Sequence, residues 1–320
     1  MPPRPVDVPA LVASARAGSP RAVARLISLV EDGHPALREV MAALAPHTGE
    51  AYVIGLTGSP GVGKSTSTNT VVAAYRARGK RIGVLAVDPS SPFSGGALLG
   101  DRIRMQDHAL DPDVYIRSMA SRGHLGGLSW TTPQAIRVLD AAGCEIILVE
   151  TVGVGQSEVE IAGLADTTLV LLAPGMGDGI QAAKAGILEI GDVFVVNKAD
   201  RDGADATVRD LRHMISLGDR TEPGLWRPPV VKTVAARGQG VDEVMEALDK
   251  HLDWLERTGT LRERRLRRAG DEIEAIALTA LRDRMGDLRS GQGIDDYAES
   301  VVAGRTDPYS AADAVLAHLG

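Results

Sequence analysis

The chain has 320 residues, of which 44% are hydrophobic and 24% charged, a balance typical of a globular protein. Its formal net charge is −7 and only 3% of its residues are aromatic, which argues against nucleic acid as a partner. No apolar run approaches the roughly eighteen residues of a membrane span, and the segment Met1–Pro20 does not resemble a signal peptide. We therefore expect a cytoplasmic protein without a membrane partner, whose lone cysteine, Cys144, is a buried thiol.

The first fifty residues are predicted to be helical. Ser19 and Pro20 form a favourable helix start, and apolar residues follow them at helical spacing. A second helix is expected over Pro35–Leu44.

From residue 51 onward, short apolar runs alternate with amphipathic segments. Strands are expected at Tyr52–Thr57, Arg81–Val87, Val114–Arg117, Glu145–Val149, Thr168–Ala173, Val193–Asn197 and Val230–Val234. Several of these runs are apolar throughout, as in strands that helices cover on both faces. The rhythm predicts an α/β fold with a doubly wound, mostly parallel sheet.

A glycine-rich loop follows the first expected strand and leads into a predicted helix, Ser65–Arg78. It reads Gly58-Ser59-Pro60-Gly61-Val62-Gly63-Lys64-Ser65 and fits the phosphate-loop pattern G-x-x-x-x-G-K-[ST]. Glycines let backbone N–H groups approach phosphate oxygens, and the start of the helix adds further donors. Lys64 is expected to reach the β- and γ-phosphates, and Ser65 to offer its hydroxyl to Mg²⁺. The sequence therefore predicts a nucleoside triphosphate site at this loop. The next residue, Thr66, is also expected to contact the nucleotide.

Three carboxylates lie at or beyond the ends of later strands. Asp88 ends the second strand and Asp101 follows a loop rich in glycine and serine; either could bind Mg²⁺ or orient water, or serve only in caps and turns. Glu150 closes another strand, three residues before Gly153, whose N–H could contact the γ-phosphate. That spacing favours Glu150 on the magnesium side, through a metal-bound water; the alternative is a solvated carboxylate. Many GTPases carry a water-positioning glutamine directly after this glycine, whereas Gln156 lies three residues beyond Gly153.

The segment Asn197-Lys198-Ala199-Asp200 ends a strand and fits the N-K-x-D pattern of guanine-binding proteins. The Asp200 carboxylate can accept hydrogen bonds from guanine N1–H and from the 2-amino group, whereas adenine offers neither donor. Val234-Ala235-Ala236 ends the next strand, where GTPases place a loop whose backbone N–H contacts the guanine carbonyl oxygen. These segments predict a preference for GTP over ATP.

The pattern changes after Leu255. Residues 262–268 form a charge run, which usually marks a solvated helix face. An apolar stripe through Ile273, Ile276 and Leu281 then requires a partner, either within its own domain or on another subunit. A last short helix is expected over Pro308–Leu319.

In combination, these motifs resemble the MeaB/ArgK family of methylmalonyl-CoA mutase-associated GTPases. The similarity runs from about residue 19 to the C-terminus, and its motifs occur in chain order: residues 56–65, 87–92, 100–105, 121–128, 150–157, 197–200 and 307–309. One departure is Val234-Ala235-Ala236, where the family usually has Ser-Ala-Leu, so a hydroxyl contact is in doubt but the backbone contact is not.

The resemblance implies a P-loop GTPase of the SIMIBI class with a helical extension over residues 1–50, a GTPase domain over 51–257 and a C-terminal helical dimerisation arm over 258–320. It implies a Mg²⁺ site at Ser65, Asp88, Asp101 and Glu150, catalysis by Lys64, Asp101 and Glu150, and a partner-responsive switch at Gln181 and Lys184. The remaining nucleotide contacts are expected at Gly153, Asn197, Lys198, Asp200, Val234, Ala235 and Ala236. Such a homodimer would dock on an adenosylcobalamin-dependent acyl-CoA mutase, with methylmalonyl-CoA or isobutyryl-CoA as the mutase substrate. There it would gate cofactor loading and protect or reactivate the mutase.

Other functions fit parts of the sequence. A metal-insertion GTPase usually carries His- or Cys-rich segments, which this sequence lacks. A small-molecule kinase or a transport-system ATPase would share the phosphate loop, but the Asn197–Asp200 segment favours guanine. A non-catalytic scaffold is disfavoured because Lys64, Ser65 and the acidic strand ends are all present.

Overall fold

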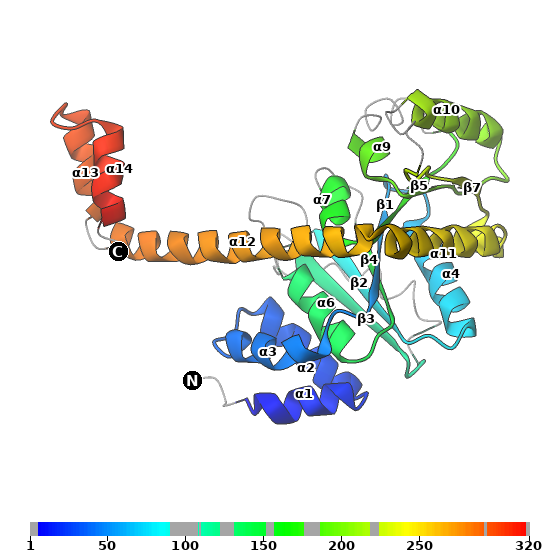
Figure 1. Cartoon of the computed structure of the whole chain (residues 1–320), viewed down its shortest axis with the longest axis horizontal. Helices are drawn as coiled ribbons and strands as arrows, with labels where there is room; N and C mark the ends of the chain where they lie inside the picture. The colour runs from blue at the N-terminus through cyan, green and yellow to red at the C-terminus, as the bar shows by residue number, and fades with distance from the viewer. Residues whose placement is uncertain are drawn as a thin grey trace. The chain divides into compact units, whose positions relative to one another are not determined.

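The computed structural model describes residues 6–89, 108, 110–121, 131–151, 157–175, 186–217, 224–290 and 293–317 (Figure 1). The chain divides into two compact units, Met1–Arg262 and Glu263–Gly320. Among the described residues, no helix combines the length and the apolar character needed to cross a membrane.

A parallel sheet forms the centre of the first unit (Figure 1). In the described part of the chain its seven strands are β1 (Tyr52–Thr57), β2 (Ile82–Pro89), β3 (Val114–Ser121), β4 (Ile146–Thr151), β5 (Thr167–Leu172), β6 (Val193–Val196) and β7 (Val230–Lys232). Their order is β3-β2-β4-β1-β5-β6-β7, and every neighbouring pair is parallel. Every strand expected from the sequence is present, and the predicted doubly wound fold is confirmed.

Helices cover both faces of this sheet (Figure 1). One face carries α1 (Val8–Arg16), α2 (Pro20–Glu31), α3 (Leu37–Leu44), the short helix η1 (Ala45–His47), α6 (Thr132–Ala141) and α7 (Ser157–Leu164), with α9 (Gly186–Ile190) and α10 (Ala204–Leu217) on β5 and β6. The opposite face carries α4 (Lys64–Ala77) and α11 (Val241–Thr258). Ser19 caps α2 as predicted, since its hydroxyl accepts from the Ala22 N–H, whereas α3 begins two residues later than expected.

Side chains of the strands alternate between two hydrophobic cores. In β1, Val53 packs with the N-terminal helices and α6, whereas Ile54 and Leu56 pack with α4 and α11. Successive side chains of a strand point to opposite faces, so a run that is apolar throughout is what two covered faces require. Because α1–α3 share a core with the sheet, they belong to the same compact unit.

The register of the central strands determines which residues are neighbours at the carboxyl ends of these strands. Leu56 of β1 lies beside Glu150 of β4, and Thr57 lies beside Val170 of β5. The chain leaves β1 directly after Thr57 and enters the glycine-rich loop. The carboxylate of β4 is therefore placed next to that loop by strand pairing alone.

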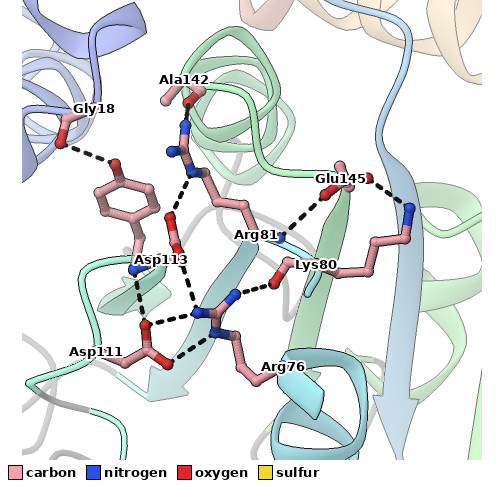
Figure 2. A network of polar contacts seen from close by, with 9 residues as sticks. Gly18, Arg76, Lys80, Arg81, Asp111, Asp113, Ala142 and Glu145 are labelled. Carbon is pink, nitrogen blue, oxygen red and sulfur yellow. Dashed lines mark hydrogen bonds and ion pairs between the residues drawn. The ribbon is translucent and has the colours of Figure 1, made fainter. Parts of the chain in front are cut away.

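A network of charged side chains ties the far end of α4 to the amino ends of the strands (Figure 2). Arg76 donates to Asp111, with 2.8 Å between Nε and Oδ2, and to Asp113, with 3.1 Å between Nη2 and Oδ2. Arg81, just before β2, also donates to Asp113, and its backbone N–H donates to Glu145, just before β4. The network fixes the C-terminal end of α4, whereas the glycine-rich loop lies at its N-terminal end.

The second unit is helical. The long helix α12 spans Thr260–Ser290 and so begins within the first unit; α13 (Gly293–Val302) and α14 (Pro308–Ala317) follow it. The predicted last helix is thus present, as α14. On α12, Ile273 is 67%, Ile276 41% and Leu281 45% exposed.

Candidate functional site

The glycine-rich loop connects β1 to α4. Gly63 is the N-cap of α4 with φ +94°, and Gly58 has φ +141°. A Cβ on Gly63 would lie 2.5 Å from Nδ2 of Asn197, and one on Gly58 would lie 2.2 Å from the carbonyl oxygen of Leu171. Both positions therefore require glycine for two reasons: a positive φ disfavours other residues, and a Cβ would clash with a neighbouring atom.

Lys64, the first residue of α4, is buried against the loop. Its ammonium donates to the carbonyl oxygens of Gly58, at 2.6 Å, and Ser59, at 3.2 Å. The residue is only 8% exposed, whereas Pro60 and Gly61 at the tip of the loop are exposed. A buried ammonium beside a helix N-terminus concentrates positive charge there, which suits a phosphate group.

Glu150 is held by two hydroxyl groups from α4. Ser65 Oγ donates to Oε1 of Glu150 at 2.9 Å, and Thr68 Oγ1 lies 2.9 Å from Oε2 and 3.0 Å from the carbonyl oxygen of Lys64. Glu150 is 4% and Ser65 6% exposed, and Thr68 is fully buried. Sequence reasoning brought Ser65 and Glu150 together but missed Thr68, although its position three residues after Ser65 places both on one helix face.

Asn197 joins the three loops at this edge of the sheet. Its Nδ2 donates to the carbonyl oxygen of Val62 in the glycine-rich loop, at 2.8 Å. Its Oδ1 accepts from Thr233 Oγ1, at 3.1 Å, and from the Ala235 N–H, at 3.0 Å. This buried amide thus forms three hydrogen bonds, one to the glycine-rich loop and two to residues that follow the end of β7, which fix the relative positions of the loops.

The residues after Asn197 continue the same arrangement. Lys198 has a left-handed backbone conformation with φ +57°, and its Nζ donates to the carbonyl oxygen of Gly61. Asp200 faces Arg237, with 3.4 Å between Oδ2 and Nη2. Arg237 was not among the predicted site residues, because nothing in the sequence pairs it with Asp200.

The structure thus brings together Gly58–Thr66, Glu150, Asn197–Asp200 and Val234–Ala236 at the carboxyl ends of β1, β4, β6 and β7. For Asp88, the described backbone places it in β2 beside Ala120 of β3. Asp101, Gly153, Gln156, Gln181 and Lys184 lie outside the described residues. Within the described ranges, no three His, Cys, Asp or Glu side chains gather as a metal-binding group, and Ser65 and Glu150 are the described side chains of the predicted Mg²⁺ site.

A parallel sheet with a phosphate loop after its central strand, and an Asn-Lys-x-Asp turn two strands away, defines a P-loop GTPase. The chain belongs to the MeaB family: the family described as "Methylmalonyl Co-A mutase-associated GTPase MeaB" matches residues 23–289. The family predicted from the sequence is confirmed, and the chain is an enzyme that hydrolyses GTP to GDP and phosphate.

Individual relatives agree with this assignment. The chain is 47% identical over 311 residues to a putative GTPase of Pyrococcus abyssi, covering 97% of this chain and 96% of the relative. It is 35% identical over 276 residues to the mitochondrial methylmalonic aciduria type A homolog of Caenorhabditis elegans, covering 81% and 69%. The crystal structure of a LAO/AO transport system kinase is similar with a TM-score of 0.72 and 26% identity, covering 98% of this chain and 97% of that one.

Proposed function

We propose that this GTPase binds Mg²⁺–GTP at the phosphate loop and associates with an adenosylcobalamin-dependent acyl-CoA mutase, such as methylmalonyl-CoA mutase. There it gates cofactor loading and protects or reactivates the mutase. The family description, which names association with methylmalonyl-CoA mutase, supports the partner, as does the name of the Caenorhabditis elegans relative. The observation that carries the nucleotide half of the proposal is the Asn197 amide, which joins the phosphate loop to the two loops of the base site.

The phosphate half of the site consists of the loop and the start of α4. Backbone N–H groups of the loop, other than that of Pro60, which has none, cradle the phosphates, and the Lys64 ammonium donates to the β- and γ-phosphate oxygens. Ser65 and Glu150 offer hard oxygen ligands 2.9 Å apart, which fits Mg²⁺, an ion that takes few protein ligands beside phosphate and water. When bound, Mg²⁺ neutralises charge on the phosphates.

The residues proposed to orient the attacking water are Glu150 and Asp101. Glu150 is held in place by Ser65 and Thr68, so its carboxylate direction is fixed before nucleotide binds. Asp101 and Asp88 complete the magnesium side in this proposal.

Three further residues are proposed to respond to the nucleotide or to the partner. The Gly153 N–H contacts the γ-phosphate. Gln181 and Lys184 respond to the mutase.

The base half of the site consists of Asp200 and the loop after β7. Asp200 accepts from guanine N1–H and the 2-amino group. In that loop the Val234 N–H donates to the Gln239 carbonyl and the Ala235 N–H to Asn197, so both donors are used within the protein. Ala236 is exposed, and its N–H is the proposed donor to the guanine carbonyl oxygen.

Residues 258–320 are proposed to form the dimerisation arm of a homodimer. The exposed apolar side chains of Leu266, Ile273, Ile276, Leu278 and Leu281 on α12 support this, since each is 41–67% exposed. An apolar stripe of this kind gains free energy when a second copy covers it.

A single-turnover GTPase assay with and without the mutase tests the proposal. We expect slow hydrolysis by the chain alone and faster hydrolysis when the mutase is present, because a partner that completes the site stabilises the charge of the transition state. Equal rates would reject gating by the mutase. Lys64→Ala should abolish hydrolysis, whereas Lys250→Ala, on the exposed surface of α11, should not.

Calorimetry with GTP and ATP distinguishes this proposal from a small-molecule kinase or a transport ATPase. We expect heat of binding with GTP and GDP and little with ATP. Tighter binding of ATP would favour the alternatives and would contradict the role of Asp200.

A further inference from the structure

We propose that Arg237 is a positioning residue for the guanine-recognising carboxylate of Asp200. The inference rests on the proposed base site and adds a residue to it that no motif contains. Arg237 Nη2 lies 3.4 Å from Oδ2 of Asp200, and the two residues come from different loops.

The backbone of the loop after β7 holds Arg237 in place. Arg237 is the last residue of the short helix η3 (Ala235–Arg237), and its N–H donates to the Val234 carbonyl at 2.8 Å. Gly238 ends the helix with φ +67°. Val234 and Gln239 then exchange two backbone hydrogen bonds, of 3.0 and 3.3 Å, which close the loop on itself.

Backbone contacts also join this loop to the one that carries Asp200. The Ala199 N–H donates to the Thr233 carbonyl at 3.0 Å, directly beside Asp200. Asn197 accepts from the Ala235 N–H on the same side. The two loops are thus fixed to each other by hydrogen bonds that do not involve the ion pair, so the backbones of Arg237 and Asp200 stay close whether or not the pair contributes energy.

The pair contributes little before nucleotide binds. The side chains of Arg237 and Asp200 are 63% and 37% exposed, and an ion pair in contact with water adds little to stability. A guanine base that covers the carboxylate removes water from the pair, and the attraction between the two charges then increases. We therefore expect Arg237 to raise the affinity for nucleotide and to leave the stability of the free protein unchanged.

A carboxylate has enough lone pairs for both partners. Its two oxygens offer about four acceptor positions, of which guanine N1–H and the 2-amino group use two. A guanidinium on Oδ2 leaves these two positions available and limits the rotation of the carboxylate. Arg237 thus holds Asp200 in the orientation that reads both guanine donors.

Comparison of GDP with IDP isolates this contact, because inosine lacks the 2-amino group. We measure dissociation constants for both nucleotides by calorimetry, with Mg²⁺, on the full chain and on its Arg237→Ala variant. We expect the variant to bind GDP about fivefold to tenfold more weakly and IDP less than about threefold more weakly, so that the preference for guanine falls. Its melting temperature without nucleotide should equal that of the parent chain.

Two further variants serve as controls. Arg237→Lys keeps the charge but loses the planar fork and should lie between the parent and Arg237→Ala. Arg201→Ala removes an exposed arginine next to Asp200 and should change neither dissociation constant. Equal weakening of GDP and IDP by Arg237→Ala, or an equal effect of Arg201→Ala, would overturn the inference.

The Asp200→Ala variant separates failure of this inference from failure of the proposed base site. If it leaves the preference for GDP over IDP unchanged, the base site itself is wrong. If it removes the preference while Arg237→Ala binds both nucleotides like the parent, only the role of Arg237 is wrong. In the double variant we expect no loss of preference beyond that of Asp200→Ala, because the two residues act through one contact.

Discussion

Replacing Thr68 by valine tests the arrangement that holds Glu150. Thr68 is fully buried, and valine keeps its shape but removes the hydroxyl that lies 2.9 Å from Oε2 of Glu150. A hydrogen bond to a charged group contributes about 1.5–3 kcal/mol. In a unit of this size each kcal/mol changes the melting temperature by about 2–4 °C. We therefore expect Thr68→Val to melt about 3–12 °C lower than the parent chain without nucleotide.

The same variant should require more Mg²⁺ for GTP hydrolysis, because its metal-side carboxylate loses one of the two hydroxyls that orient it. Loss of such an orienting partner typically weakens metal binding by about tenfold or more. Both effects are measured by thermal unfolding in the absence of Mg²⁺ and by a Mg²⁺ titration of single-turnover hydrolysis.

Two control variants make the result specific. Thr68→Ser retains the hydroxyl and should require nearly the same Mg²⁺ concentration as the parent chain. Thr70→Val lies on the same helix, where its hydroxyl donates to the Thr66 carbonyl at 2.7 Å, and should leave the Mg²⁺ dependence unchanged. If Thr68→Val melts like the parent, or if Thr68→Ser behaves like Thr68→Val, the hydroxyl does not hold Glu150.

Three further outcomes follow from the described contacts. Burial raises the pKa of the Cys144 thiol to about 12, so at pH 8 a thiol reagent should react about a thousandfold more slowly with folded than with urea-unfolded protein; equal rates would contradict the burial. Hydrogen bonds from Arg76 lower the pKa of the Asp111 carboxyl in the folded protein. The ion pair therefore stabilises the fold fully above the unfolded pKa, near 3.8, and this stabilisation is lost as pH falls through the lower folded pKa. Arg76→Gln should therefore unfold at less urea than the parent at pH 7, and a difference that persists unchanged at pH 2 would argue against the ion pair. Gly63→Ala should weaken GDP binding about tenfold or more, because its Cβ would lie 2.5 Å from an amide nitrogen; Gly61→Ala, with φ +80° but nothing within 4 Å, should cost less, and equal losses would assign the effect to backbone strain alone.

The parts of the fold that the sequence predicted are those with a local cause. The strands were predictable because helices on both faces leave uninterrupted apolar runs, and the phosphate loop because all the residues of its motif lie within one stretch of eight. The same holds for the helix start at Ser19, which one side-chain hydrogen bond defines.

The parts that the sequence did not predict depend on contacts between distant segments. Thr68 and Glu150 are 82 residues apart, and the pairing of β1 with β4 beneath α4 brings them together. Arg237 reaches Asp200 because backbone hydrogen bonds join two loops. Neither contact has a spacing that a motif could record.

The strand order has a consequence for the newly synthesised chain. β1 pairs only with β4 and β5 among the described strands, and β4 leaves the ribosome about 90 residues after β1. At about 5–20 residues per second, the phosphate-loop strand waits roughly 5–20 s for its first neighbour. A fragment that ends before Ile146 carries every residue of the phosphate loop and still lacks both described strands that pair with β1.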